Sequence, residues 1–394
     1  MRRFAIAVPL VASSLAAMTV LTGPAVASGP VHPAVSAVTS APAPGSVIAT
    51  IATGTKPTDI AMDTEKALLY VLDAGTPRVV VVSTSSNTVI STIAVPENAT
   101  YLTPDPKRSQ IFVTSGDASV GTGSLSVIDT RTGTVTGTTP LRGDPRRPVL
   151  DADRAVLYIA QAAEGDRPGT LTTIDAASHA VLANVTLGVS PGTPELDAAG
   201  SRLYIPQNTT VAVYDTHSTK RIANVKVGEF PDFVVLDPTH HQYFAVKLDA
   251  LIAIDSRTNK VKATLRMPIA IDDGPPALDA GRQRMYIPSW PYRGRITVLD
   301  TRTLKVKARI TVGLAPGGPV LDPIRRQLYV REFDEGNGHT LYAIDTAKNT
   351  VIGAIGVGKG PLAPVLDAAS GRLYVPSWAT GEISVVNTAA LAPR

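Results

Sequence analysis

Three side chains that could transfer protons stand out in this sequence of 394 residues. Glu195 occupies a position where seven related segments, described below, carry Ala, Thr or Val. Burial among such neighbours would raise the pKa of a carboxyl group and suit it to acid–base work. Asp232 and His339, in predicted loops, are the other candidate acid–base residues. Because a lone buried carboxylate is costly, we favour the alternative that Glu195 forms an ion pair with Arg146 or Arg147.

A second candidate site consists of large aromatic rings with charged neighbours. At one position of a repeated segment the last three copies carry Trp, Phe and Trp, whereas the first five carry Ala, Gly, Ala, Asn and Leu. Flat rings beside cations suit an apolar or sugar-like ligand. The alternative is that these rings only pack beneath the loops. The predicted ligand-binding residues are Trp290, Tyr292, Arg293, Arg331, Phe333 and Trp378.

Composition excludes several other kinds of chemistry. The chain has no cysteine, which rules out a thiol nucleophile, a disulfide framework and thiolate metal sites. Its six histidines form no H-x-x-x-H pair, and H-E-x-x-H and G-x-S-x-G motifs are absent. We predict no metal-ligand motif and no cofactor, while a metal bound in a central channel stays open. The net charge of +4 is too small to favour nucleic acid or another polyanion, which remain alternative partners.

Internal repeats indicate which elements must position these residues. Eight times, an Asp is followed seven residues later by an aromatic residue within an apolar triplet. Each copy also has a second marker, Asp, Ser or Asn, that ends a run of alternating β-branched residues. The first pairs are Asp63/Tyr70, Asp105/Phe112, Asp151/Tyr158, Asp197/Tyr204, Asp237/Phe244, Asp279/Tyr286, Asp322/Tyr329 and Asp367/Tyr374, and the second markers are Ser83, Asp129, Asp175, Asp215, Asp255, Asp300, Asp345 and Asn387.

A repeat of about 43 residues with four short apolar runs is typical of a propeller blade. The last copy reaches Arg394 before a fourth strand could form, whereas residues 47–54 match residues 351–358 and precede the next marker by the same distance. We therefore predict an all-β fold, an eight-bladed β-propeller of four-stranded blades. Its ring is closed by the N-terminal strand, which completes the last blade. The marker aspartates should be structural, since Asp at a strand end accepts hydrogen bonds from the following turn.

Loop lengths suggest which face of this ring binds. With strands named A to D from the centre outwards, the A–B and C–D turns share one face, here called the turn face. The B–C and D–A connections share the other, the loop face, and carry the length variation. Variable connections on a rigid scaffold are where binding residues concentrate, so we expect binding at the loop face.

The N-terminal residues have the pattern of an export signal. Arg2 and Arg3 precede an apolar stretch over residues 4–21, and Ala25-Val26-Ala27 offers a small-x-small cleavage site. The predicted organisation is a signal peptide over residues 1–27, a Pro/Ala/Ser-rich linker over 28–45 and the propeller over 46–394. We expect a secreted or cell-envelope protein without a membrane span after cleavage, and a monomer; a retained anchor is the alternative.

The V-G-x-x-P turn at Val227-Gly228 and the Arg-Leu-Tyr-Val strand at Arg372 resemble the YVTN-type propeller repeats of exported proteins, including the YncE-like group. The resemblance covers residues 47–387. It implies a ligand-binding, protein-binding or scaffold module, and a small molecule, a polysaccharide or a protein are the expected partners. Neighbouring propeller families include lactonases and antibiotic lyases, so a lyase or lactonase-type hydrolase with acid–base carboxylates at the channel mouth is the alternative function.

Overall fold

A computed structural model describes residues 45–117, 121–270, 274–289, 294–332 and 338–388. Short β-strands fill most of these ranges, because runs of Val, Ile, Leu and Tyr alternate with turn-forming Asp, Gly, Thr and Asn. Short 3-10 helices follow strand A in blades two, five and six, namely η1 (Pro106–Arg108), η2 (Pro238–His240) and η3 (Ala280–Arg282). No helix in the described ranges is long and apolar enough to span a bilayer.

The strands form eight antiparallel sheets, each with the order A-B-C-D that the repeat predicts. The A strands are β2 (Pro57–Asp63), β6 (Ala99–Asp105), β11 (Val149–Asp151), β15 (Glu195–Asp197), β19 (Phe233–Asp237), β23 (Ala277–Asp279), β27 (Pro316–Asp322) and β31 (Val365–Asp367). The B strands are β3 (Leu68–Asp73), β7 (Gln110–Asp117), β12 (Val156–Ala162), β16 (Arg202–Gln207), β20 (Gln242–Lys247), β24 (Arg284–Ser289), β28 (Gln327–Glu332) and β32 (Arg372–Ser377). In blade three, β10 (Asp144–Pro145) also pairs with β12, so strand A is in two pieces there.

The outer half of each blade is a C–D hairpin. The C strands are β4 (Arg78–Ser83), β8 (Thr122–Asp129), β13 (Pro168–Asp175), β17 (Thr210–Asp215), β21 (Ala250–Asp255), β25 (Arg295–Asp300), β29 (Thr340–Asp345) and β33 (Glu382–Asn387). The D strands are β5 (Thr88–Ala94), β9 (Thr134–Arg142), β14 (Val181–Val189), β18 (Arg221–Lys226), β22 (Lys260–Arg266), β26 (Lys305–Thr311), β30 (Thr350–Gly356) and, for blade eight, β1 (Val47–Ala52).

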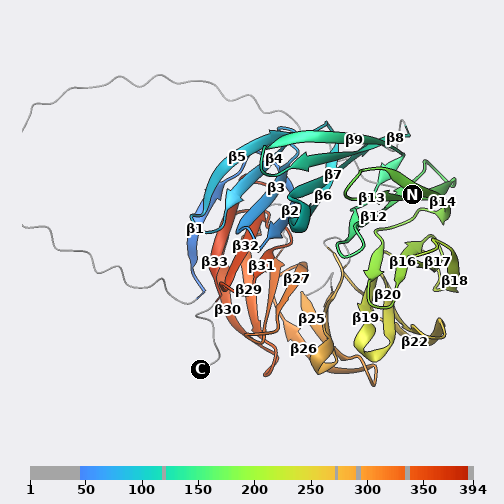
Figure 1. Ribbon diagram of the computed structural model, residues 1–394. Coiled ribbons are helices and arrows are strands. Elements are labelled where there is room, and N and C mark those ends of the chain that lie inside the picture. Colours follow the sequence, from blue (N-terminus) through green and yellow to red (C-terminus); the bar gives the residue numbers. More distant parts are fainter. Residues whose placement is uncertain (1–44, 118–120, 271–273, 290–293, 333–337, 389–394) are drawn as a thin grey trace, which may run out of the picture. The chain divides into compact units, whose positions relative to one another are not determined.

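The N-terminal strand completes the last blade, as predicted. In that sheet the order is β1-β33-β32-β31, and Ile51 lies opposite Ile383. Figure 1 shows β1, the first strand of the chain, beside β33, the last. The eight-bladed propeller is therefore confirmed, and its last sheet is formed by both ends of the described chain.

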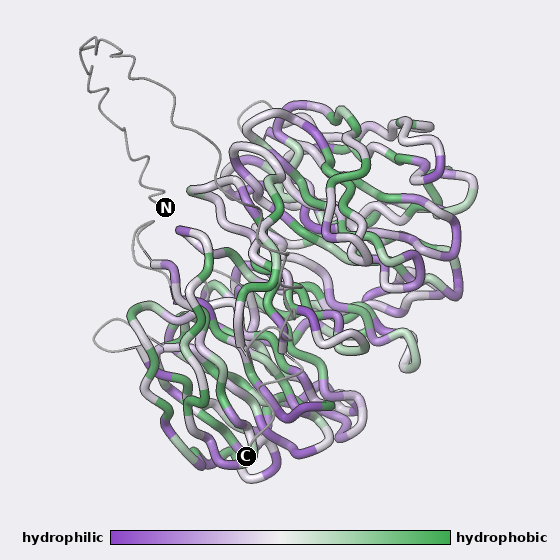
Figure 2. Tube along the Cα trace, turned by 90° about the vertical axis from the view of Figure 1, so that its left-hand side faces the viewer, coloured by the Kyte–Doolittle hydropathy of each residue, from purple (hydrophilic) through white to green (hydrophobic). Residues whose placement is uncertain are grey.

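Eight hydrophobic clusters hold neighbouring blades together. Each cluster combines buried residues of two successive blades, and one combines Val71 of blade one with Tyr374 and Ile383 of blade eight. The eight aromatic residues of the repeat are all buried. Figure 2 shows the apolar residues gathered within the strands and polar residues at the turns. Each blade thus packs on two neighbours, and the ring has no open end.

Aspartates at strand ends begin the turns, as the repeat predicts. At the end of β25, Oδ1 of Asp300 accepts hydrogen bonds from the backbone N–H of Thr303 at 2.7 Å and from its hydroxyl at 2.8 Å. At the end of β27, Oδ1 of Asp322 accepts the N–H groups of Ile324 and Arg325. These hydrogen bonds fix the short turns of the turn face and leave length variation to the loop face.

Candidate functional site

A half-buried ion pair links Asp59 on strand A of blade one with Arg147, between the two pieces of strand A in blade three. Nη2 and Nη1 of Arg147 donate to the two carboxylate oxygens of Asp59 at 2.6 and 2.9 Å. In blade two, between them, the carbonyl of Leu102 accepts from Arg147 and its N–H donates to Asp59. The guanidinium carbon lies 5.2 Å from the ring centre of Tyr101. The A-strand regions of three blades are therefore joined by one polar network.

The environment of Asp59 makes its carboxylate depend on Arg147. Its side chain is 8 % exposed, and burial raises the pKa of its carboxyl, while the charge of Arg147 and the hydrogen bonds act in the opposite direction. A buried carboxylate that loses its partner is costly to the folded state. We assign this pair a structural role.

Arg146 has different partners. Its Nη1 donates to Oδ2 of Asp144 at 2.8 Å, and its Nε donates to the carbonyl of Pro191 at 3.0 Å in the next connection. Neither Arg146 nor Arg147 forms an ion pair with Glu195 in the described part of the chain. The favoured pairing of Glu195 is therefore wrong, because both guanidinium groups are engaged by aspartates closer to them.

Glu195 begins β15 and lies opposite Tyr204 of β16. Burial raises the pKa of its carboxyl to about 7, although the charge of Arg147 lowers it in part. The carboxyl borders a pocket of about 460 Å³ whose other walls include Val234, Val235 and Pro276. An acid with this pKa is partly ionised near neutral pH and can give or take a proton.

A second pocket, of about 300 Å³, lies at the loop face. It includes Asp232, and its lining residues come from blades two to five and the D–A connections between them. Tyr101 and Arg146 line it together with the polar D–A connection that contains Ser190 and Thr193, and with the exposed ring of Phe230. We call it the loop-face pocket; it is lined by Tyr101, Arg146, Ser190, Pro191, Gly192, Thr193, Asn208, Phe230, Pro231, Asp232 and Phe233.

Phe230 has an unusual backbone conformation for its residue type. Its φ is +52°, in the left-handed region, and 61 % of its side chain is exposed. Its N–H donates to the carbonyl of Asn208 at 2.6 Å, which fixes the turn. A bulky residue in this region is strained. In other D–A connections the left-handed residues near the same place are small or polar: Asn98, Gly143, Ser190, Ala315 and Gly360.

The predicted aromatic site can be described only in part, because Trp290, Tyr292, Arg293 and Phe333 lie outside the described residues. Trp378 is 37 % exposed, and its indole lies so close to Gly360 that a Cβ there would come within 2.4 Å of Nε1.

Arg331, on β28, is 2 % exposed and belongs to the interior rather than to an open surface. His339 is exposed, and its carbonyl accepts the N–H of Val357. Their functional roles stay predictions.

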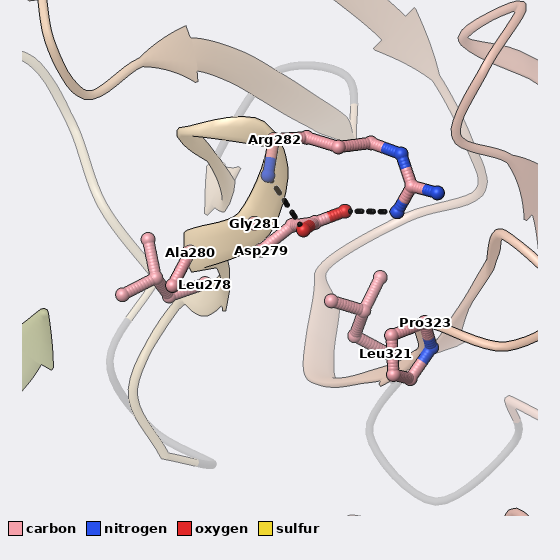
Figure 3. A pocket seen from close by; sticks show the side chains of 7 residues that line it. All are labelled: Leu278, Asp279, Ala280, Gly281, Arg282, Leu321 and Pro323. Carbon is pink, nitrogen blue, oxygen red and sulfur yellow. Dashed lines mark hydrogen bonds and ion pairs between the residues drawn. The ribbon is translucent and has the colours of Figure 1, made fainter. Parts of the chain in front are cut away.

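A third pocket, of about 600 Å³, lies on the turn face between blades six and seven. Figure 3 shows Asp279 and Arg282 beside Leu278, Leu321 and Pro323. Arg282 donates to Asp279 at 2.8 Å from Nη1 and at 3.0 Å from the backbone. Equivalent pairs occur in blades two and seven, at Arg108–Asp105 and Arg325–Asp322. Internal pairing thus neutralises much of the charge at this end of the channel.

No cluster of three or more His, Asp or Glu side chains suitable for a metal ion occurs among the residues that the structure describes. Sequence reasoning identified Glu195 but missed the loop-face pocket and the Arg147–Asp59 pair. The signal for Phe230 as a candidate binding residue is in the sequence, since it is a large aromatic residue within a V-G-x-x-P turn.

No protein-family model matches the sequence, and no curated protein is significantly similar to it. Many solved structures share the fold. Sqt1 of Saccharomyces cerevisiae aligns with a TM-score of 0.71 at 10 % identity, over 87 % of this chain and 98 % of that one. BamB of Moraxella catarrhalis gives 0.66 at 13 % identity, over 87 % and 99 %. The dihydro-heme d1 dehydrogenase NirN, solved in complex with DHE, gives 0.63 at 12 % identity, over 85 % and 76 %. At these identities the likeness shows a common propeller fold and leaves the function open.

Proposed function

We propose that this protein is a binding module whose loop face takes a small ligand or a side chain of a partner protein in the loop-face pocket. The observation that carries the proposal is Phe230, a strained and largely exposed ring at the pocket. Strain of this kind costs about 1–3 kcal/mol and persists where function or packing requires it. Because most of the Phe230 side chain is exposed, packing does not explain why this strain is kept.

The other lining groups suit an aromatic ligand that also carries a hydrogen-bond acceptor. Phe230 and Tyr101 offer ring surfaces, and Arg146 is held in place by Asp144 and the Pro191 carbonyl. These two hydrogen bonds use Nε and Nη1, so among the described residues Nη2 of Arg146 remains as a donor. A volume of about 300 Å³ is at the small end of ligand pockets.

The test is a Phe230→Gly variant, with Ala315→Gly as the matched change at a residue of another D–A connection that lines none of the three pockets described above. Glycine accepts positive φ without strain, so we expect Phe230→Gly to raise stability by about 1 kcal/mol, seen as a higher Tm. Saturation-transfer NMR with benzamide, indole-3-acetate and N-acetylphenylalanine amide should show binding to the wild type and to Ala315→Gly but not to Phe230→Gly. A lower Tm for Phe230→Gly would assign the ring to packing and contradict the proposal.

A second candidate function is catalysis, and Glu195 is the observation that favours it. A carboxyl with a pKa of about 7 beside a pocket suits general acid–base chemistry of the lyase or lactonase kind. Hydrolysis of a panel of small lactones, with a rate that titrates near pH 7 and is lost in Glu195→Gln, would support it. Equal rates in wild type and Glu195→Gln would exclude this role for Glu195.

We further propose that the chain is a YVTN-type, YncE-like protein exported by its N-terminal segment. The V-G-x-x-P and Arg-Leu-Tyr-Val motifs support the first part, and the basic, apolar and small-x-small pattern before Ser28 supports the second. N-terminal sequencing of the protein recovered outside the cytoplasm should begin at Ser28, and an intact Met1 would contradict cleavage.

A further inference from the structure

Basic residues are concentrated on the outer strands of three neighbouring blades. The C–D hairpins of blades four, five and six, residues 210–226, 250–266 and 295–311, contain twelve Lys and Arg and three Asp, a net charge of +9. The C–D hairpins of the other five blades have charges that sum to zero, and the whole chain carries +4. The twelve are Lys220, Arg221, Lys226, Arg257, Lys260, Lys262, Arg266, Arg295, Arg302, Lys305, Lys307 and Arg309, and all are exposed.

Equivalent positions of the C–D hairpins carry lysine in blades four, five and six and uncharged residues in other blades. At the start of strand D, the residue opposite the marker at the end of strand C is a lysine in blades four, five and six: Lys220, just before β18, and Lys260 and Lys305, the first residues of β22 and β26. Blades one, two, three and seven carry Thr88, Thr134, Ala180 and Thr350 at this position. Two residues beyond, at the bulge that every C–D pair contains, blades five and six add Lys262 and Lys307, where blade seven has Ile352.

Protection of edge strands does not explain this pattern. Lysine on an exposed edge prevents sheet-to-sheet aggregation, but every blade exposes a D strand, and β5, β14, β30 and β1 carry no charge at all. Ion pairing does not explain it either, since Lys307 with Asp300 and Arg266 with Asp249 are the pairs that the described residues form with these twelve. Ten of the twelve cations form no direct ion pair in that part of the chain, and of these Lys262 acts on Asp255 through its charge alone.

We propose that the outer strands β18, β22 and β26 form a docking surface for a flexible linear polymer of phosphate groups. Blades four, five and six are successive, joined by shared clusters, and their outer strands follow one another around the ring (Figure 1). Each strand places cations along its length, about 20 Å for the seven residues of β22. A phosphate chain crossing the three strands meets Lys and Arg at each of them, and both side chains bind phosphate well.

The surface lacks the features that two other anionic partners need. Of the rings in these three hairpins Tyr214 is buried and the imidazole of His217 is exposed, so one small ring in a single turn is all that nucleic-acid bases could stack on. The exposed large apolar side chains are Ile222, Val261 and Val306, one on each strand, and no exposed Trp or Phe accompanies them in these hairpins to insert into a bilayer. Recognition here rests on repeated backbone charge.

The experiment measures binding of fluorescently labelled inorganic polyphosphate to the full chain by anisotropy at several NaCl concentrations. The test variant is Lys220→Thr/Lys260→Thr/Lys305→Thr, which introduces the residue that blades one, two and seven already carry. The matched control is Lys56→Thr/Lys107→Thr/Lys359→Thr, three exposed lysines elsewhere with the same loss of charge. We expect the test variant to bind roughly tenfold more weakly or worse, with a log–log salt slope smaller by about 2, while the control binds as wild type does.

Several outcomes would overturn the proposal. Equal losses in test and control variants would mean that net charge alone acts. Tighter binding of oligothymidine than of polyphosphate at equal phosphate number would indicate base contacts. Binding of phosphatidylglycerol vesicles without binding of polyphosphate would identify a membrane surface, and equal binding of alginate would remove the preference for phosphate. Unchanged melting temperatures in both triple variants show that the comparison concerns folded protein.

Discussion

Glu195 and Asp59 are both acidic residues on A strands, and their partners give them different roles. Asp59 accepts two hydrogen bonds from Arg147 and one from the Leu102 amide, so its charge is compensated. Glu195 feels Arg147 only through its charge, and burial dominates its pKa. The repeat identified Glu195 as exceptional, but it could not show that Arg147 contacts Asp59, 88 residues away, across blade two. The spacing of the repeat predicts which strands are neighbours, but it does not predict which side chains contact each other across an intervening blade.

Glu195 should make the stability of the protein depend on pH. Its pKa in the folded state is about 7 against an ordinary value of 4.5 for glutamate, so the folded state holds the proton more tightly. This group stabilises the fold below about pH 4.5, and its contribution is lost as pH rises through 7, by up to about 3 kcal/mol. Urea unfolding of wild type and Glu195→Gln between pH 4.5 and 8 measures it. We expect the variant to be the more stable of the two at pH 8, and parallel pH curves would contradict the shift.

At the scale of elements, the repeat predicted the order and nearly all strands, because the seven-residue offset from Asp to aromatic reflects a fixed A–B hairpin. It did not predict the bulge in each C–D pair or the left-handed residues of the D–A connections. Those depend on local backbone geometry that many residue types accept: Phe230 and Gly360 share one such conformation. The strain at Phe230 therefore became visible only in the structure.

Strand β1 should contribute strongly to stability, since it covers the edge of β33 and places Ile51 in the cluster between blades eight and one. Deleting residues 46–54 should cost at least about 3 kcal/mol, because it uncovers that cluster and leaves the C-strand edge unpaired. Ile51→Asp tests the same point without truncation, and Thr50→Asp, at the exposed neighbouring position, is the control. Thermal unfolding monitored by circular dichroism measures all three. A deletion mutant as stable as the parent would show that β1 is dispensable.

At the scale of the whole molecule, circular packing should couple blades that never touch. In a linear repeat array the terminal units have one neighbour and can unfold separately, whereas here every blade shares a cluster with two others. Losing one blade opens the ring and uncovers two clusters at once, which favours a single cooperative transition despite the size of the domain.

Two distant core substitutions test this coupling. Leu157→Ala lies in the cluster of blades two and three, and Leu328→Ala in that of blades six and seven; both side chains are fully buried. Each should cost about 2–5 kcal/mol. If the ring unfolds as a unit, differential scanning calorimetry will show one peak in each variant, shifted to lower temperature by similar amounts, with calorimetric and van't Hoff enthalpies in agreement. Two resolved peaks in either variant would mean that groups of blades unfold independently, and closure by β1 would then stabilise blade eight and its neighbour rather than the whole ring.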